Sequence, residues 1–507
     1  MKHWIKSGSP WIWLTAGSVS ISMISVLGIL LLIGWKGLSY FWPTPLQEWH
    51  TIDGKVIVGQ LYDVEKFHGK DAEHQERLII KVGNRDIYGF DFINIDQDKI
   101  QSVSKPSALV VVDRLQHGKF FGTIIETSNG LELTRQQAES WVRSEKAKVD
   151  LLEQEQHKLY GLLDDLPNSD LSKNEKVKKE SLLNQQVDSI LTQLNYSYLI
   201  LKDGQGTIYQ LNSDNVLGIW FPNAMSLQEK IIHWLGALYD FVSENPREAN
   251  SEGGVFPAIF GTILLVLLMS VIVMPLGVIA AIYLHEYAKP NMLTRLVRIA
   301  VINLAGVPSI VYGVFGLGFF VYVVGGTIDQ LFYSTQLPTP TFGTPGLLWS
   351  ALTLAILTLP VVIVATEEGL SRIPSSVRHG SLALGATQFE TLWKIVVPMA
   401  SPAIMTGLIL AVARAAGEVA PLMLVGVVKL APSLPVDNVA PYLHLDRKFM
   451  HLGYHIYDVG FQSPNVEAAR PIVYATAFLL VTVIIGLNLT AIAIRNNLRE
   501  KYRTLEL

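Results

Sequence analysis

Five stretches without a charged side chain constrain this chain of 507 residues more than any other feature of its sequence. A helix of roughly 20 apolar residues crosses a bilayer core of about 30 Å, and each stretch is long enough to do so. A sixth apolar stretch, 395–428, is interrupted by Arg414 and Glu418. Six spans predict a multi-pass α-helical membrane protein. The uninterrupted stretches are 7–35, 253–284, 299–328, 330–366 and 471–494.

Prolines locate the start of the fourth span. Pro338, Pro340 and Pro345 lie in the first half of its uncharged stretch. Proline removes a hydrogen bond from a helix interior and clashes with the preceding turn. We therefore expect the spanning helix to begin near Gly346.

Residues 36–254 differ from the rest of the chain in charge. They carry 23 Lys/Arg and 32 Asp/Glu, whereas the other 288 residues carry 17 and 12. A net acidic, soluble-like domain, 36–252, is therefore inserted between the first and second spans. This split excludes a uniformly globular enzyme. The absence of cysteine excludes disulfide scaffolds, Cys-based zinc sites and thiol catalysis.

The insert has the pattern of an α+β domain. Its short apolar runs are separated by turn dipeptides such as Asn129-Gly130 and Asp203-Gly204, which favour hairpins. Thr134 with Gln137, and Ser172 with Glu175, have capping-box spacing. They predict an antiparallel helical hairpin at about 134–194. The insert contains no catalytic constellation, and we interpret its scattered histidines as surface residues.

Lysine and arginine in short loops indicate the orientation, because cationic loops stay cytoplasmic. With both termini in the cytoplasm, the insert is extracytoplasmic. Residues 1–35 are interpreted as an uncleaved anchor, because a signal peptide has a shorter apolar region and a small-residue cleavage site. The expected cytoplasmic cations are Lys2, Lys6, Lys289, Arg295, Arg298, Arg372, Arg378, Lys394, Arg495, Arg499, Lys501 and Arg503.

Arg414 is the most informative single residue, because a cation inside a membrane span is costly and usually pairs or marks a substrate path. Glu418 lies four residues later, on the same face of a continuous helix. The pair is either a structural tie or a site where the guanidinium transiently meets an anion. An arginine fork can donate two hydrogen bonds to adjacent oxygens of a tetrahedral oxyanion.

The loop 367–398 between the fourth span and the interrupted span is amphipathic. Its residues predict a short helix from about 376 to 384, a break at Gly385, and a second helix that ends before Pro398. Such helices would lie at the membrane surface as a docking element. The Gly-Lys pairs of the chain lack the following Ser or Thr of a Walker loop, so energy for active transport must come from a partner or an ion gradient.

The loop resembles the coupling motif of ABC-importer permeases, Glu-Ala-Ala-x-x-x-Gly followed by Ile-x-Leu-Pro. Here His379-Gly380-Ser381 replace Glu-Ala-Ala, while Gly385 and Pro398 keep their places. The resemblance implies that this element docks on an ATPase subunit. The implied coupling residues are His379, Gly380, Ser381, Leu384, Gly385, Ala386 and Pro398.

Three further segments resemble the PstA-type permease of the phosphate-specific ABC importer. They are 303–316, Leu359-Pro360 with Glu367-Glu368, and 413–422, whose sequence is Ala-Arg-Ala-Ala-Gly-Glu-Val-Ala-Pro-Leu. The resemblance covers about residues 246–507 and implies that Arg414 and Glu418 belong to the phosphate pathway. Many relatives carry an arginine where Val364 stands here, and an alternative source of the second cation is the partner permease.

The resemblance implies an ABC-importer permease core at 253–507, without catalytic residues or a bound cofactor. It also implies a heterodimer with a PstC-type permease, two PstB-type ATPases that use ATP and Mg, and a PstS-type periplasmic phosphate-binding protein. The location would be the bacterial plasma (inner) membrane, with inorganic phosphate as substrate and no nucleic acid partner. The role of the insert is not implied; its net charge of −9 should repel phosphate, so we expect it to bind a protein or shape the vestibule.

Three alternatives remain open. The chain could be a permease for sulfate or molybdate, which are also tetrahedral oxyanions. It could be a membrane sensor whose outer domain binds the ligand, although only thirteen residues follow Ile494. A metal site at His451 and His455, near His444, is a weaker alternative than ordinary loop contacts.

Overall fold

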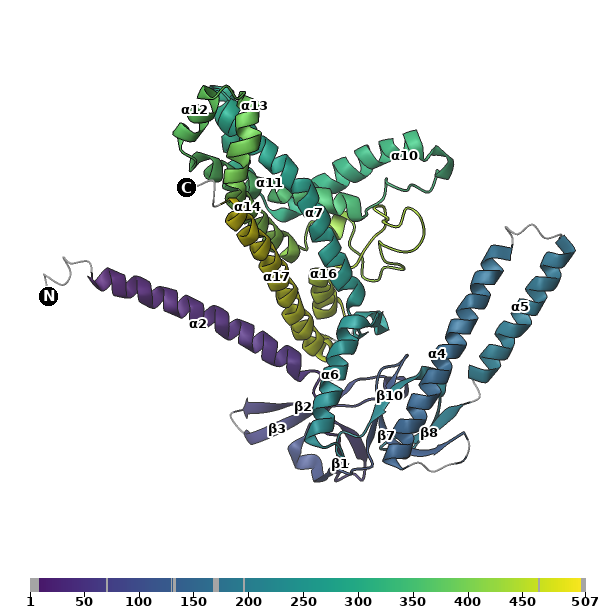
Figure 1. Ribbon diagram of the computed structural model, residues 1–507. Helices are drawn as coiled ribbons and strands as arrows, with labels where there is room; N and C mark the ends of the chain where they lie inside the picture. The colour runs from purple at the N-terminus through teal and green to yellow at the C-terminus, as the bar shows by residue number, and fades with distance from the viewer. Residues whose placement is uncertain are drawn as a thin grey trace. The chain divides into compact units, whose positions relative to one another are not determined.

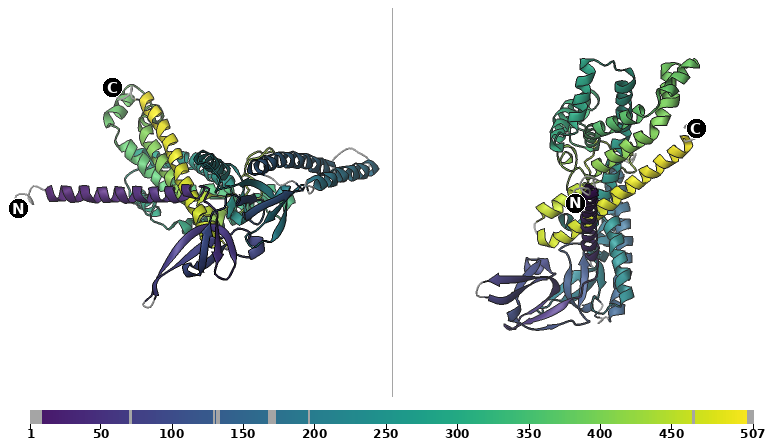
Figure 2. Two further views of the ribbon diagram at one scale, coloured as in Figure 1. Left: turned by 90° about the horizontal axis from the view of Figure 1, so that it is seen from below. Right: turned by 90° about the vertical axis from the view of Figure 1, so that its left-hand side faces the viewer.

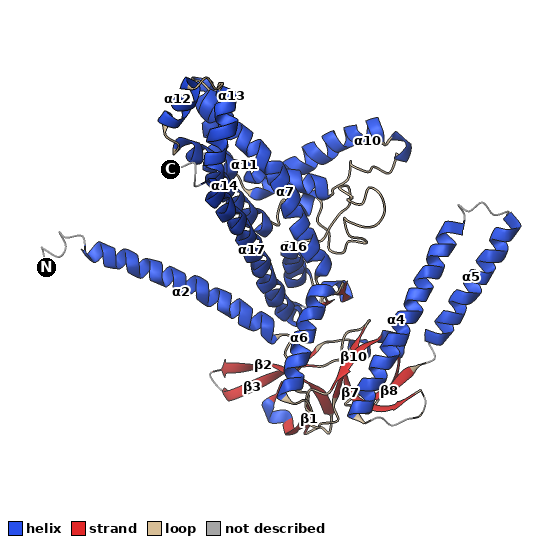
Figure 3. Cartoon of the chain, viewed as in Figure 1, coloured by secondary structure: helices blue, strands red, loops and turns tan. Residues whose placement is uncertain are grey.

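The computed structural model describes residues 9–69, 72–128, 130, 134–166, 173–194, 197–463 and 466–502. The chain divides into two compact units, one formed by residues 1–40 with 240–507 and the other by residues 41–239. The second unit begins five residues after the expected limit of 36 and ends thirteen residues before the expected limit of 252. The strands of the five-stranded sheets belong to the second unit (Figure 3).

Six helical segments among the described residues are long and apolar enough to cross a membrane. The predicted number of spans is thereby confirmed. The fourth span begins at Leu347, directly after Gly346, as its prolines indicate. The six segments are Trp11–Ser39, Phe256–Tyr287, Ser309–Phe332, Leu347–Ser371, Gln388–Gly417 and Ala469–Asn497.

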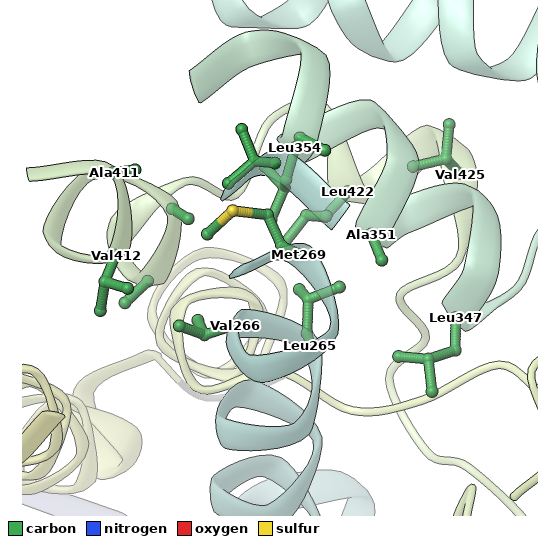
Figure 4. Packing of buried hydrophobic residues seen from close by; sticks show 14 of the residues in the cluster. Leu265, Val266, Met269, Leu347, Ala351, Leu354, Ala411, Val412, Leu422 and Val425 are labelled. Carbon is green, nitrogen blue, oxygen red and sulfur yellow. The ribbon is translucent and has the colours of Figure 1, made fainter. Parts of the chain in front are cut away.

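Three helices form the centre of the membrane unit: α7 (Phe256–Ile282), α11 (Leu347–Ser371) and α14 (Val397–Gly417). Their buried side chains include Leu265, Met269, Leu354 and Ala411, which form one cluster (Figure 4). Gly277 shows how closely α7 and α11 approach, because a Cβ there would lie 2.6 Å from Cγ1 of Val362. Small residues of this kind allow membrane helices to pack backbone against backbone.

The third span differs from the continuous stretch expected at 299–328. An amphipathic helix, α8 (Met292–Leu304), ends before Pro308, and the span begins with α9 (Ser309–Phe315). It continues through the π-helix η6 (Gly316–Gly325) into α10 (Gly326–Phe332). A proline disfavours helical geometry in the residue before it, so the chain turns between α8 and α9. An apolar run without charges does not reveal this break.

The first and last spans are α2 (Ser9–Ser39) and α17 (Val466–Tyr502). The C-terminal end of α2 contacts α17 (Figures 1 and 2). A Cβ on Gly37 would lie 2.9 Å from the carbonyl oxygen of Tyr474, so only glycine permits this approach. The remainder of α2 presents apolar side chains such as Ile21 and Leu31 outward, as expected for a helix surrounded by lipid.

The second unit contains two five-stranded antiparallel sheets. Trp49, Ile80 and Ile95 are buried on the first, and Val112, Phe120 and Leu199 on the second. In spatial order, the first sheet contains β4 (Phe92–Asp96), β3 (Ala72–Lys81), β2 (Val56–Gly69), β1 (Gln47–Thr51) and β5 (Ile100–Ser104). The second contains β10 (Val216–Trp220), β6 (Val110–Arg114), β7 (Phe120–Thr127), β8 (Tyr198–Lys202) and β9 (Ile208–Asn212).

Two long helices connect β7 to β8: α4 (Arg135–Asp165) and α5 (Lys173–Leu194), which pack against each other through Val149 and Ile190. The capping box of Thr134 and Gln137 opens α4 as predicted. Asn129 and Ser172 lie outside the described residues. Asp203 forms the predicted turn between β8 and β9, where its carboxylate accepts hydrogen bonds from the backbone of Gln205 and Thr207. The α+β class of the insert is thus confirmed.

A further helix, α6 (Leu227–Ser243), contains the boundary between the two units. A short ribbon of β11 (Pro246–Arg247) and β12 (Glu252–Gly253) precedes α7. After α14 the chain forms α15 (Leu422–Val425), a long loop, α16 (Leu452–Tyr457) and the π-helix η9 (Asp458–Gln462). These last segments carry several of the buried polar side chains of the first unit.

Candidate functional site

Arg414 lies in the last turn of α14. Its Nε is 3.5 Å from Oε1 of Glu418, and the two side chains are 32% and 21% exposed. Charge-assisted hydrogen bonds are normally about 2.7–2.9 Å long, so this contact is loose. A guanidinium has five N–H donors, and this geometry leaves Arg414 able to bind an incoming anion.

Glu418 is not on the same helix face as Arg414, in contrast to the expectation. Gly417 ends α14, and Glu418 has extended backbone with φ −80° and ψ 129°. The ion pair therefore bridges a helix end. Pro421 follows three residues later, at the start of α15. The interrupted span is thus a helix, a break and a short helical turn, and the break holds the acidic partner.

The first helix of the third span, α9, packs closely against the chain at this break. A Cβ on Gly313 would lie 2.7 Å from Cα of Pro421, so α9 approaches the chain after Glu418 closely. Tyr312, the neighbour of Gly313, is within electrostatic range of Arg414. Its hydroxyl donates a 2.6 Å hydrogen bond to the carbonyl oxygen of Leu304 in α8. Arg414 therefore lies beside the junction of α8 and α9.

A cleft of about 590 Å³ lies between α8, α11 and α14. Val364 lines it, at the position where the resemblance led us to expect an arginine in many relatives. Its charged lining residues are Arg298, Glu367 and Glu368. Leu410 of α14 also lines the cleft, one helical turn before Arg414. Sequence reasoning assigned Arg298 to a cytoplasmic loop and did not place it here.

The loop at 367–398 forms two helices around a glycine turn. The first is α12 (Ser375–Ala383), which contains His379, Gly380 and Ser381. Leu384 ends it, and Gly385 has a left-handed φ of +90°. Thr387 then caps α13 (Gln388–Thr391), with Glu390 completing a capping box.

The second helix does not end before Pro398, so this part of the expectation is wrong. Helical structure continues from α13 through the π-helix η8 (Leu392–Val396) into α14. Pro398 lies inside this continuous helix, two residues after the π-helix η8 ends. The loop is therefore connected by continuous helix to Arg414 at the other end of α14.

An ion pair holds the loop against the membrane unit, and a contact between two hydroxyls joins its helices. Arg378 places Nη2 2.9 Å from Oε1 of Glu286, and it also donates to the carbonyl oxygens of Ile373 and Leu370. Within the loop, the buried hydroxyls of Ser381 and Thr391 are 2.8 Å apart. Ser381, which replaces the second alanine of the family motif, thus joins α12 to α13. His379 is exposed.

An apolar patch covers the outer surface of this loop. Leu384 is 91% exposed, Phe389 66% and Trp393 63%. The rings of Phe389 and Trp393 are stacked, with centroids 6.4 Å apart and planes 3° from parallel. Exposed aromatic groups of this kind usually mark a protein interface. Sequence reasoning missed Phe389 and Trp393, although their spacing of four residues places them on one helix face.

Gly385 and Gly380 provide a matched pair of substitutions. A Cβ would meet open space at both positions, but only Gly385 has positive φ. We expect Gly385→Ala to destabilise the loop by about 1–2 kcal/mol, because an L-residue is strained in left-handed geometry. Gly380→Ala lies inside α12 and should be neutral or stabilise it by about 0.5–1 kcal/mol. Thermal unfolding of the purified protein in detergent measures the stability of both variants. An equal change in stability for the two substitutions would contradict the role of Gly385 as the residue with left-handed backbone.

The histidines of the outer loop do not converge. His444 Nε2 is 2.9 Å from Oδ1 of Asp437, whereas His451 and His455 are buried. The described residues include no group of three or more His, Cys, Asp or Glu side chains able to hold a metal ion. The backbone N–H of Gly453 donates to Nδ1 of His451, which caps α16. Both ring nitrogens of His455 are buried without a hydrogen-bond partner among the described residues.

These two buried histidines predict a loss of stability in acid. Burial lowers the pKa of His451 and the pKa of His455 to about 4. The charge of Asp458 raises the pKa of His455, and the charge of Lys429 lowers it. An unfolded histidine has a pKa near 6.5, so the folded form is favoured above pH 6.5 and loses stability as the pH falls toward 4. The expected slope is about 1.4 kcal/mol per pH unit for each histidine.

The measurement is thermal unfolding between pH 7.5 and 4.5. His455→Leu removes one titrating group and should flatten the acid side of the profile, whereas His379→Leu, at an exposed position, should leave it unchanged. Parallel profiles for wild type and His455→Leu would show that His455 does not cause the acid sensitivity.

Residues 273–503 match the family model described as binding-protein-dependent transport system inner membrane component. The match includes the cleft, the loop at 367–398, Arg414 and Glu418. It does not extend into residues 41–239. The resemblance to ABC-importer permeases is therefore confirmed for the membrane unit, and the insert has no counterpart in the matched model.

Individual proteins with similar sequences are also named as transport permeases. The chain is 34% identical over 195 residues to the probable ABC transporter permease protein YqgH of Bacillus subtilis, covering 38% of this chain and 59% of that protein. It is 38% identical over 175 residues to the phosphate transport system permease protein PstA 1 of Mycobacterium tuberculosis, covering 34% and 52%. The chain thus spans a little more than half the length of these curated relatives.

A solved structure of the MetNI methionine ABC transporter in an inward-facing conformation matches 48% of this chain and 94% of its own chain. The identity is 19% and the TM-score 0.34. The family model covers the signature at 413–422. Residues 273–503 therefore match the inner membrane component of binding-protein-dependent transport systems and are similar in sequence to PstA-type permeases.

Proposed function

We propose that the chain is the permease subunit of an ATP-driven ABC importer that carries inorganic phosphate across the bacterial plasma (inner) membrane. The observation that carries this proposal is the pairing of Arg414 with Glu418 at a helix break. Their 3.5 Å contact, made through Nε of Arg414, neutralises the charge of the guanidinium in the membrane and leaves its two NH2 groups available as donors. A phosphate oxyanion can therefore take the place of the carboxylate.

The proposed cycle assigns ATP and Mg to two PstB-type ATPases, which dock on the loop at 367–398. The exposed Leu384, Phe389 and Trp393 suit this contact. Continuous helix from α13 through α14 would transmit movement of the loop to Arg414. A PstC-type permease would complete the membrane pathway, and a PstS-type binding protein would deliver phosphate from the periplasm.

In this proposal both termini are cytoplasmic and the 41–239 unit lies outside the cytoplasm. The sequence range 36–254 has nine more acidic than basic residues, which disfavours a role in collecting anions. We therefore assign the unit to protein contact or to shaping the entrance, and not to substrate capture.

The test is uptake of radiolabelled phosphate by cells that depend on this chain, in the presence of excess sulfate or molybdate. We expect phosphate uptake to persist under both competitors and to require the ATPase. Strong inhibition by sulfate or molybdate would instead identify the chain as a permease for that oxyanion. A signalling response without uptake would favour the sensor alternative.

A further inference from the structure

The cleft between α8, α11 and α14 contains a second arginine–glutamate pair. Arg298 of α8 places Nη2 3.4 Å from Oε1 of Glu367 in α11. As at Arg414, the separation exceeds that of a normal charge-assisted hydrogen bond. The Arg298 side chain is 48% exposed and that of Glu367 is 23% exposed.

Two features keep Arg298 directed at the cleft. Its Nη2 donates a 2.8 Å hydrogen bond to the carbonyl oxygen of Leu284, which also lines the cleft. Oε1 of Glu367 is buried 3.4 Å from Arg298 Nη2 and makes no hydrogen bond among the residues described. The carboxylate therefore positions the guanidinium while leaving most of its donors available.

Helix α14 borders the cleft and also carries Arg414. Leu410 lines the cleft, and Arg414 follows four residues later on α14. Side chains four residues apart lie on the same face of a helix, about 6 Å apart along its axis. Arg414 therefore stands on the helix face that borders the cleft.

Val364 lies on the wall of the same cleft as Arg298. The side chain at 364 is apolar and 38% exposed, so a cation in the cleft at this level must come from another residue. Arg298 supplies it from α8, within this chain. No second permease is required for this charge.

We propose that Arg298 forms a second, inner binding station for a tetrahedral oxyanion, between Arg414 and the exit from the cleft. This inference rests on the proposed transport of an oxyanion. Glu367 neutralises Arg298 while the station is empty and competes with the anion for it. Transport requires binding that is strong enough for entry and weak enough for release, and a competing carboxylate meets that requirement.

The test compares phosphate uptake by the complete importer carrying single variants. Arg298→Gln should raise the KM for phosphate at least tenfold. Arg295→Gln, at an exposed position three residues earlier on α8, should leave it within twofold of wild type. Adding Val364→Arg to Arg298→Gln should restore the KM to within threefold, because the new cation lines the same cleft.

The outcomes separate this inference from the proposed function. Normal uptake by Arg298→Gln, together with loss of uptake by Arg414→Ala, would overturn the inner station and leave phosphate transport intact. Failure of Val364→Arg to restore uptake would also count against the station. Normal uptake by Arg414→Ala would overturn the proposed pathway itself.

A labelling experiment avoids dependence on Arg298 variants that assemble poorly. The chain has no cysteine, so Val364→Cys introduces its sole thiol. In the nucleotide-free complex, inorganic phosphate should slow the reaction of this thiol with a sulfonate-bearing reagent at least threefold. Chloride at equal ionic strength should not. An equal rate with phosphate and chloride would overturn the station.

Discussion

Arg414→Ala is expected to abolish anion uptake while membrane insertion and assembly stay normal. The substitution removes the planar fork that would donate two hydrogen bonds to the oxyanion. Hydrogen bonds to charged groups contribute about 1.5–3 kcal/mol each, so loss of two weakens binding a hundredfold or more. Because Arg414 is in the last turn of α14 and partly exposed, its removal leaves the core of α7, α11 and α14 unchanged.

Two further variants sharpen this prediction. Arg414→Lys keeps the charge but lacks the fork, so it should retain some uptake with a raised KM. Arg447→Ala serves as a control, because Arg447 pairs with Asp437 in the loop between α15 and α16. Radiolabelled phosphate uptake and co-purification of the partner subunits are measured for each. Uptake by Arg414→Ala at the wild-type rate would remove Arg414 from the pathway.

The double substitution of Phe389→Ala with Trp393→Ala is expected to release the ATPase. Both rings are exposed and stacked on one side of the loop. Aromatic side chains bury about 150–250 Å² each at interfaces, and central ones commonly contribute 2 kcal/mol or more. Loss of two should weaken docking by about a thousandfold.

Co-purification of the ATPase with the permease measures this effect, and substrate-stimulated ATP hydrolysis gives a second readout. Phe332→Ala is the matched control, because Phe332 is 77% exposed at the end of α10, on a different segment of the unit. If the double variant retains the ATPase as the control does, the patch is not the docking surface.

The membrane spans could be predicted because a helix that crosses a bilayer carries few charged side chains along its whole length. The start of α11 at Leu347 followed from Pro345, since proline restricts helices locally and strongly. The break between α8 and α9 was missed because Ala305, Gly306 and Val307 are apolar, and residues of these types also occur within membrane helices. The π-helical segments have no residue pattern distinct from that of an α-helix.

The candidate site was only partly predictable. Arg414 and Glu418 stood out because charges are rare inside apolar stretches, but their geometry depends on where α14 ends. Arg298 looked like an ordinary loop cation, and only the packing of α8 against α11 brings it to Glu367. Phe389 and Trp393 could be recognised as a patch only once their exposure was known. Spacing shows which residues share a face, but not whether a neighbour covers that face.

ATP-driven uptake into proteoliposomes tests the central claim most directly. The chain would be reconstituted with its partner permease, the ATPases and the phosphate-binding protein, and accumulation of labelled phosphate measured with wild type and Arg414→Ala side by side. We predict phosphate accumulation that requires ATP and Arg414 and persists in excess sulfate. Equal accumulation with Arg414→Ala, or accumulation of sulfate in place of phosphate, would contradict the proposed transport of phosphate past Arg414.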